Sequence, residues 1–263
     1  MLTLVKKPLV NLCVVIPVYD HEHAIGDVVA ELLSHDLPCI LVDDGCSAAC
    51  ARVLDALLAA EPDKLSLVRH KTNCGKGAAV LSGITCAVWQ GYSHVLQVDA
   101  DGQHCIADVP YFSAMARQYP DAIIVGYPVY EMTAQKSRLY ARYLTHLWVW
   151  INTLSLQIKD SMCGFRVYPV QAVMAVSAKN NLGNRMEFDT EILVRLLWDG
   201  KEIINLPTML TYPANGVSHF LFWRDNLLIT RMHIFLFFGM LLRFPHLFFN
   251  LVLRCARHLR SLS

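Results

Sequence analysis

The stretch Val95–His104 reads VLQVDADGQH, and the rest of the chain is interpreted from it. Its apolar run ends in two carboxylates, Asp99 and Asp101, with one small residue between them. Side chains at i and i+2 of a strand share a face, so both carboxylates can converge on one hard cation, with Gln103 as a further oxygen ligand. Mg²⁺ and Mn²⁺ favour such ligands together with water and substrate phosphates. The alternative is a solvated turn, because Asp and Gly also favour turns.

The composition points to a large α/β domain with a membrane contact. A chain of 263 residues fits one such domain, or one domain plus an appendage. Its hydrophobic content is 54% and its mean hydropathy is +0.35, both high for a soluble globular protein. The excess of apolar residues is concentrated after about residue 139, which favours contact with a membrane. The net charge of +1 gives no indication of a nucleic-acid partner.

Cysteine usage and the N-terminus indicate a cytosolic location. The nine cysteines are scattered and include no Cys-x-x-Cys pair, which is typical of reduced thiols. Cys46 and Cys50 have no matching pair of ligands, so we do not expect zinc. The apolar stretch after Lys6 and Lys7 ends before Pro17 without a cleavage site, so no signal peptide is predicted. We expect the protein on the cytoplasmic face of a membrane, the inner membrane in a bacterium.

Apolar runs and amphipathic segments alternate along the first hundred residues. We expect strands at residues 9–16, 39–42, 65–69 and 95–98, with helices at 24–33, 48–60 and 78–89 between them. Four such alternations predict a doubly wound, mostly parallel sheet, in which ligands bind beyond the carboxyl ends of the strands. Polar clusters occupy those ends, at residues 17–20, 43–45, 75–77 and 99–101. We therefore expect one site at this edge of the sheet.

The turn Gly75-Lys76-Gly77 precedes a predicted helix and has two interpretations. Its backbone N–H groups can hold an anion at the helix N-terminus. It can equally be a tight turn that needs glycine. It is not a P-loop, because Gly77 stands at the Ser/Thr position, and it is not a dinucleotide fingerprint, because Val80 stands where the third glycine belongs.

The middle of the chain predicts further strands and helices. We expect a helix at residues 106–119, a fifth strand at 122–125, a segment at 167–176 leading into a helix, a helix at 186–198, and short apolar runs at 203–206 and 209–212. The aromatic-rich segment 139–158 fits an amphipathic helix at a membrane interface, or alternatively a buried core helix. Asp189 and Glu191 are two residues apart on a helix, so at most one of them should face the site.

Residues 220–253 form the most apolar section of the chain. Their longest uncharged piece, Ile234–Leu242, is too short for a spanning helix of about 20 residues. We expect two interfacial helices bent at Pro245, with a tilted or hairpin insertion into the membrane as the alternative. The following basic residues suit anionic headgroups, or they form an ordinary solvated helix end. These residues are Arg254, Arg257 and Arg260.

Six blocks, taken in order, carry a family resemblance. They are VVIPVY, LVDDGCS, NCGKGAA, VDADGQH, DSMCGFR and FDTE. Over roughly residues 12–219 the chain resembles family 2 glycosyltransferases, most closely the polyprenol- or dolichol-phosphate mannosyltransferase-like branch. The resemblance implies a GT-A fold over residues 1–219, with a nucleotide-binding half at 1–105 and an acceptor half at 106–219. Membrane-associated helices and a basic tail would occupy residues 220–263.

The resemblance also implies roles for individual residues. Pro17, Tyr19 and Asp44 would contact the base and ribose of a UDP- or GDP-linked sugar, with Lys76 nearby. Asp99, Ala100 and Asp101 would lie at the nucleotide sugar, and Asp99, Asp101 and Gln103 would meet Mg²⁺ or Mn²⁺ and the diphosphate. Arg138 would approach a phosphate of the donor or acceptor. The candidate bases are Asp189, Glu191 and Asp160.

Such enzymes invert the anomeric carbon by direct displacement, with the metal stabilising the leaving nucleotide diphosphate. A hydroxyl acceptor needs a general base, whereas a lipid phosphate is already an anion. The expected function is therefore a membrane-associated, metal-dependent glycosyltransferase acting on a lipid or lipid-linked acceptor. The alternatives are a non-catalytic relative that binds membrane or a partner, and a haloacid-dehalogenase-like phosphatase with an aspartyl nucleophile.

The sequence departs from the family pattern at three places. Asp20-His21 stands where Asn-Glu is usual, and Gly126-Tyr127-Pro128 replaces Gly-Ser-Arg. Near the end, residues 213–219 read PANGVSH in place of the R-x-x-G-x-S-K pattern. Two arginines and a lysine that help hold phosphates in the family are therefore absent, and His219 stands in place of the lysine.

Overall fold

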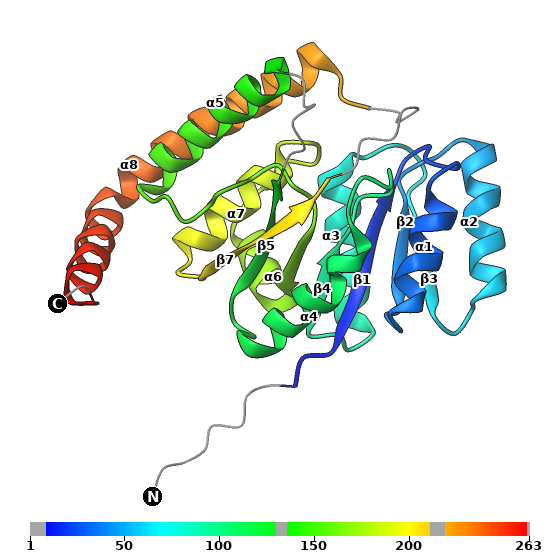
Figure 1. The fold of residues 1–263 in the computed structure, drawn as a ribbon. Coiled ribbons are helices and arrows are strands. Elements are labelled where there is room, and N and C mark those ends of the chain that lie inside the picture. Colours follow the sequence, from blue (N-terminus) through cyan, green and yellow to red (C-terminus); the bar gives the residue numbers. More distant parts are fainter. Residues whose placement is uncertain (1–8, 130–135, 211–218, 262–263) are drawn as a thin grey trace, which may run out of the picture.

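One seven-stranded sheet organises the molecule (Figure 1). The computed structural model describes residues 9–129, 136–210 and 219–261, and of residues 136–141, 246 and 250–261 it describes the backbone alone. The strands are β1 (Leu12–Val18), β2 (Cys39–Asp43), β3 (Leu65–Arg69), β4 (His94–Gln97), β5 (Ile123–Val129), β6 (Arg166–Pro169) and β7 (Ile203–Met209). The helices are α1 (Ile25–Ser34), α2 (Ala48–Ala60), α3 (Lys76–Trp89), α4 (Val109–Gln118), α5 (Lys136–Thr153), α6 (Val170–Lys179), α7 (Phe188–Trp198) and α8 (Phe222–Ser261), with a short 3₁₀ helix at Ile106–Asp108.

The sheet is mostly parallel and doubly wound, as predicted. Its strand order is β3-β2-β1-β4-β6-β5-β7, and β1 pairs in parallel with both β2 and β4. Because these strands run in the same direction, the segments that follow β1, β2 and β4 meet at one edge. Among the described strands, β6 alone is antiparallel to its neighbours β4 and β5. The prediction for residues 167–176 missed this strand. Its four residues are mostly buried, so they show no alternation of apolar and polar side chains.

Helices cover both faces of the sheet. Helices α1, α2 and α4 pack on one face around Ile25, Leu54 and Phe112, while α3, α6 and α7 pack on the other around Ile84 and Val173. The helix predicted from residue 78 begins at Lys76. The first of the two apolar runs predicted around Pro207 lies in β7, which continues through Pro207 to Met209, and residues 211–212 of the second run lie outside the described part of the structure. Strand β7 lies at the edge of the sheet, where a residue without an N–H group is tolerated.

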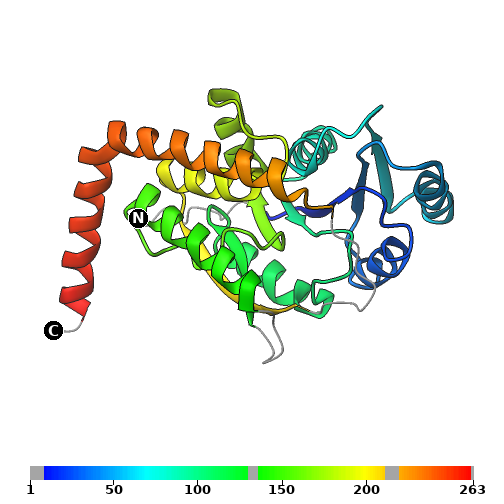
Figure 2. The same ribbon diagram turned by 90° about the horizontal axis from the view of Figure 1, so that it is seen from above.

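Helices α5 and α8 lie side by side and pack against α7 (Figures 1 and 2). Helix α8 buries Met232, Leu236 and Met240 toward the domain. The opposite face of this pair exposes many large apolar side chains, among them Tyr143, Leu144, Leu147, Trp223, Leu227, Phe235, Phe238 and Leu242. The pair therefore combines core packing with an exposed apolar surface, and the membrane interface predicted for residues 139–158 stays a prediction.

The prediction of two C-terminal helices is wrong, because α8 continues through Pro245 as one helix. A proline inside a helix removes one hydrogen bond and bends the helix without ending it when the flanking residues favour helix. Figure 2 shows α8 changing direction where its colour passes from orange to red. The segment Phe222–Pro245 is also long and apolar enough to cross a membrane by length and composition, which corrects the judgement that the section is too short.

Candidate active site

The turn after β4 carries the two aspartates of the opening stretch. Strand β4 ends at Gln97, so Asp99 and Asp101 lie beyond the strand and do not share a strand face as predicted. Asp101 is half-buried, and its Oδ1 atom accepts a hydrogen bond of 3.0 Å from the backbone N–H of Gln103. Asp99 is turned toward the protein, where His104 Nε2 lies 3.3 Å from its Oδ2 atom. The two carboxylates therefore have different environments.

Lys76 bridges two carboxylates that are distant in sequence. Its Nζ atom, at the start of α3, lies 2.7 Å from Asp99 Oδ1 and 2.8 Å from Asp189 Oδ2. Burial alone would lower the pKa of Lys76, but the two carboxylates outweigh this effect and raise it. Burial likewise opposes ionisation of Asp99, but Lys76 and His104 hold its pKa below the usual value. These opposite shifts favour the charged forms of Lys76 and Asp99.

Asp189 is held in place from several directions. Gln97 Nε2 donates to its Oδ1 atom at 3.1 Å. The fully buried Arg166 donates to the backbone oxygen of Asp189 at 2.6 Å and to that of Ser161 at 2.7 Å. Arg166 belongs to one of the family-like blocks, but no role was predicted for it. It joins the loop before β6 to α7 and so fixes Asp189 against Lys76.

Two other candidate bases are occupied by structural contacts. Glu191 accepts from Arg195 Nε at 2.8 Å and from the backbone N–H of Gly183 at 2.8 Å, so it faces away from Lys76. Asp160 accepts from Arg142 at 2.9 Å and from the backbone N–H of Cys163 at 2.7 Å. Burial opposes ionisation of Asp160, but hydrogen bonds from His146 and Arg142 outweigh it and lower its pKa.

Arg138 lies in α5, and its side chain is outside the described part of the structure. Residues 213–218, which carry the last departure from the family pattern, are outside it as well.

The predicted nucleotide-contacting residues differ in accessibility. Pro17 and Tyr19 follow the buried part of β1 and are half-buried. Asp44 is 2% exposed, and its two oxygens accept backbone N–H groups of Cys74 at 2.8 Å and Gly75 at 2.7 Å. Its carboxylate therefore shapes the turn before α3. Ala100 has its side chain in the core at 2% exposure, so only its backbone can reach a ligand.

The turn after β4 fits a divalent cation on the side of Asp101. Asp101 and Gln103 supply the oxygen atoms that Mg²⁺ and Mn²⁺ prefer, and both are half-buried rather than enclosed. Asp99 shares its charge with Lys76, so it is a less independent ligand. Space here is tight, because a Cβ atom on Gly164 would lie 2.4 Å from Asp99 Oδ2. The loop before β6 can approach this aspartate only because residue 164 is glycine.

A cavity of about 410 Å³ lies beside Lys76. Its walls include polar groups to which the sequence analysis assigned no role: Asn73, Arg185 and Arg224. Tyr19, Lys76, His219 and Leu221 also line it. The arginines come from the loop before α7 and the first turn of α8, and both lie outside the six family-like blocks. The one feature of the sequence that could have pointed to these two arginines is that each is a basic residue near an apolar segment.

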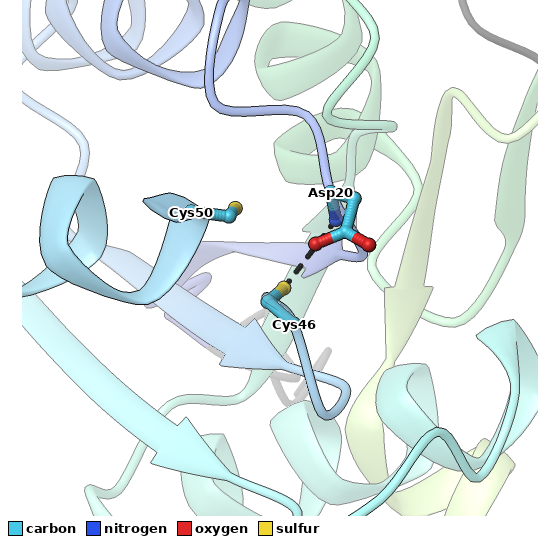
Figure 3. A group of neighbouring side chains, drawn as sticks. All are labelled: Asp20, Cys46 and Cys50. Atoms are coloured by element: carbon cyan, nitrogen blue, oxygen red, sulfur yellow. Dashed lines mark hydrogen bonds between the residues drawn. The ribbon is translucent and has the colours of Figure 1, made fainter. Parts of the chain in front are cut away.

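A second cluster of side chains lies near the end of β1, where Asp20, Cys46 and Cys50 have ligand-type atoms within 4.8 Å of one another (Figure 3). Cys46 Sγ donates to the backbone oxygen of Val18 at 3.3 Å, and Asp20 Oδ1 accepts from Ser47 N at 2.6 Å. Burial raises the pKa of the Cys46 and Cys50 thiols. These protonated thiols support the loops beside Tyr19, and their chemistry does not favour a metal.

Comparison with known proteins identifies the family of this chain. Residues 13–174, more than half of the chain, match the family described as Glycosyl transferase family 2. The chain belongs to this family. Family 2 glycosyltransferases are a different class from haloacid-dehalogenase-like phosphatases, so the phosphatase alternative is not retained.

Two curated relatives show the branch of the family 2 enzymes that the chain is similar to. Polyprenol monophosphomannose synthase of Mycolicibacterium smegmatis is 24% identical over 226 residues, covering 81% of this chain and 82% of the relative. Dolichyl-phosphate beta-glucosyltransferase of Dictyostelium discoideum is 25% identical over 210 residues, covering 72% of this chain and 63% of the relative.

Solved structures confirm the GT-A fold of this family 2 enzyme. Glucosyl-3-phosphoglycerate synthase of Mycobacterium tuberculosis superposes with a TM-score of 0.61 and 14% identity, covering 88% of this chain and 80% of that protein. The same synthase in complex with Mn²⁺, UDP and glucosyl-3-phosphoglycerate superposes with a TM-score of 0.59 and 13% identity, covering 88% and 79%. At this identity the likeness concerns the fold.

Proposed function

We propose that this glycosyltransferase moves a sugar from a UDP- or GDP-linked donor to a lipid phosphate, with inversion and with the help of Mg²⁺ or Mn²⁺. The proposal rests on the hydrogen bonds that the carboxylates of the three candidate bases already make. Asp189, Glu191 and Asp160 each accept hydrogen bonds on both carboxylate oxygens, from cationic side chains, Gln97 or backbone N–H groups. A base held in this way does not suit a hydroxyl acceptor, whereas an anionic phosphate needs no base.

The donor would bind at the carboxyl ends of β1, β2 and β4. Pro17 and Tyr19 are the accessible residues of this edge, and they would contact the base and ribose. Asp44 would act indirectly, because it holds the turn on which the donor rests. Residues 1–105 would form this nucleotide-binding half, and residues 106–219 the acceptor half.

Asp101 and Gln103, with Asp99 beside them, would hold the cation. When bound, Mg²⁺ or Mn²⁺ stabilises the negative charge that develops on the leaving diphosphate. Lys76 contacts both Asp99 and Asp189 and so holds the two carboxylates in position. The Mn²⁺ and UDP in the complex of the related M. tuberculosis synthase support this assignment.

The transfer itself would be a single displacement. A phosphate oxygen of the acceptor attacks the anomeric carbon from the face opposite the nucleotide. The bond between that carbon and the diphosphate oxygen breaks, and the nucleotide diphosphate leaves with the electron pair. No proton is transferred, which agrees with the ion-paired state of Asp189. The names of the curated relatives, a polyprenol monophosphomannose synthase and a dolichyl-phosphate glucosyltransferase, support a lipid phosphate as acceptor.

The exposed face of α5 and α8 would lie on the cytoplasmic surface of a membrane. Aromatic and aliphatic side chains such as Trp148, Trp223 and Phe235 are partly or largely exposed on it. Tryptophan is favoured at membrane interfaces, and a helix pair with one apolar face binds there. Residues 220–263 would thus attach the domain to the surface that holds its acceptor.

A binding panel tests the donor half of this proposal. The purified full chain is heated with UDP- and GDP-linked sugars, in the presence of Mn²⁺ or of a chelator. At 100 times Kd a ligand stabilises the fold by about 2.7 kcal/mol, which raises Tm measurably. We expect at least one nucleotide sugar to raise Tm only with the metal. Stabilisation by none of them would favour a non-catalytic relative.

A further inference from the structure

Two arginines from different elements, the loop before α7 and the first turn of α8, line the cavity beside Lys76. Arg185 and Arg224 both line this cavity of about 410 Å³. We infer that this pair recognises the phosphate of the acceptor. The inference rests on the proposed transfer to a lipid phosphate and names the residues that select it.

Arg185 is positioned by a loop that is docked on the start of α3. The backbone oxygen of Asn184 accepts a hydrogen bond of 3.0 Å from Ala78 N. Arg185 itself donates through Nη1 to Asn73 Oδ1 at 3.0 Å. A Cβ atom on Gly75 would lie 2.4 Å from Asn184 O and 2.6 Å from Arg185 Cγ, so glycine at this position allows the close approach. The guanidinium group is therefore held near Lys76 with part of its donor capacity still available.

Arg224 stands in the first turn of α8 and is exposed. Asp225, which also lines the cavity, accepts the backbone N–H of Leu221 at 2.7 Å and so acts as a cap of the helix. The cavity is lined by this one carboxylate and by the guanidinium groups of Arg185 and Arg224, so its charged side chains favour an anion. Arginine suits phosphate because its planar group can donate two parallel hydrogen bonds.

His219 adds a third polar group to the same wall. Its ring packs edge-on against Tyr19, with 4.9 Å between the ring centroids. Its Nε2 atom is buried and makes no hydrogen bond to any part of the chain that the structure describes. This orphan atom is suited to a ligand oxygen. Leu221 also lines the cavity, so the site combines basic and apolar groups.

The surroundings of Arg224 identify the anion as one with an apolar tail. Phe222 is 64% exposed and Trp223 is 84% exposed, and both flank Arg224 in sequence at the start of the apolar face. The flat base of a nucleotide could cover only one of these rings, whereas a lipid chain could cover both and continue along the exposed apolar side chains of α8. A lipid phosphate would place its headgroup between the arginines and its chain over these aromatic side chains. The observations thus favour the acceptor phosphate over the donor diphosphate.

The test uses the purified full chain with Arg224→Gln and Arg185→Gln, and with Arg185→Lys to preserve the charge. Arg231→Gln is the matched control, because Arg231 lies on the same helix outside the cavity, over the ring of Phe235. Equilibrium binding is measured with decyl phosphate, decanol, inorganic phosphate and UDP in the presence of Mn²⁺. We expect each glutamine variant to bind decyl phosphate at least about tenfold more weakly, with its affinity for UDP unchanged. The control variant should bind all the ligands as the unmodified chain does.

Each other outcome contradicts the inference in a recognisable way. Weaker UDP binding with unchanged decyl phosphate binding would assign the arginines to the donor diphosphate. Inorganic phosphate bound as tightly as decyl phosphate would remove the role of the apolar tail. Unchanged binding of every ligand would exclude a phosphate site. Because decyl phosphate binding needs no sugar transfer, failure of the proposed reaction would be seen separately, as lack of turnover by the unmodified chain.

Discussion

At the scale of residues, the distribution of charge around Lys76 determines which carboxylate is available to a metal. This ammonium group lies 2.7 Å from Asp99 and 2.8 Å from Asp189, so both carboxylates are neutralised from within the protein. Asp101 has no such cation among its described contacts and is the carboxylate left for a metal. We propose that the two aspartates of this short motif have different roles, with Asp99 mainly structural and Asp101 binding the metal.

Asp101→Asn should abolish metal-dependent transfer while leaving the fold intact. The reason is that Asp101 is half-buried and its side chain makes one local hydrogen bond, to Gln103 N. We expect a loss of at least about a hundredfold in turnover with Mn²⁺, since metal-bound charge stabilisation contributes several kcal/mol. Asp63→Asn, in an exposed turn, is the control. Normal turnover by Asp101→Asn would refute the metal assignment.

Gly164→Ala should disturb the same turn from the other side. The added Cβ atom would lie 2.4 Å from Asp99 Oδ2, so the carboxylate or the loop must move. Such crowding in a packed region costs about 1–3 kcal/mol. Gly26→Ala in α1 meets no atom within 4 Å and serves as the comparison. Chemical denaturation measures both; equal stability of the two variants would show that the approach of Gly164 to Asp99 is not tight.

Asp160→Asn should lower the stability and change its dependence on pH. Asp160 is 3% exposed, and losing one partner of a buried ion pair costs about 3 kcal/mol. Because the pKa of Asp160 is lower in the folded chain than in the unfolded chain, the unfolded chain binds the proton first as pH falls. Its contribution is therefore present above about pH 4 and decreases below that value. Parallel stability curves for both proteins between pH 2 and 6 would contradict this role.

At the scale of elements, the parts of the fold that could be predicted are those with a local pattern. The three strand–helix units before β4 each show an apolar run followed by helical periodicity, and their bounds agree with the structure within a few residues. Strand β6 is four residues long and antiparallel, so its identity depends on partners in β4 and β5. Helix α8 continues through Pro245 because of packing and flanking residues that local rules do not include.

The apolar face of α5 and α8 predicts membrane binding that can be altered without harming the core. Phe238 and Leu242 are 60% and 84% exposed on α8. Replacing both with glutamate should weaken binding to anionic vesicles by roughly tenfold or more, since each buried side chain contributes about 1.5–3 kcal/mol. Trp89→Glu is a matched control, because Trp89 is also 84% exposed but lies on α3. Unchanged sedimentation of the double variant with vesicles would disprove attachment through this face.

At the scale of the whole molecule, the site is assembled from parts that lie far apart in the chain. Lys76 and Asp189 are brought together by the packing of α3 against α7, and the first turn of α8 closes the cavity next to them. The sequence predicted which residue types follow the strands, but not which of them neutralise each other. Arg185 and Arg224 could not be foreseen, because they lie outside the strand ends. Helix α8 both lines the cavity and carries the exposed apolar face. The candidate site and the proposed membrane surface are therefore adjacent.

The most direct test of the central claim is transfer of a labelled sugar to a lipid phosphate. The purified full chain is incubated with vesicles containing a polyprenyl phosphate and with labelled UDP- or GDP-sugars, with Mn²⁺ or with a chelator. The account predicts that label from at least one donor enters the lipid phosphate with Mn²⁺, that none enters the matching polyprenol, and that the chelator abolishes transfer. Transfer to the alcohol but not to the phosphate, or transfer that persists without metal, would contradict it.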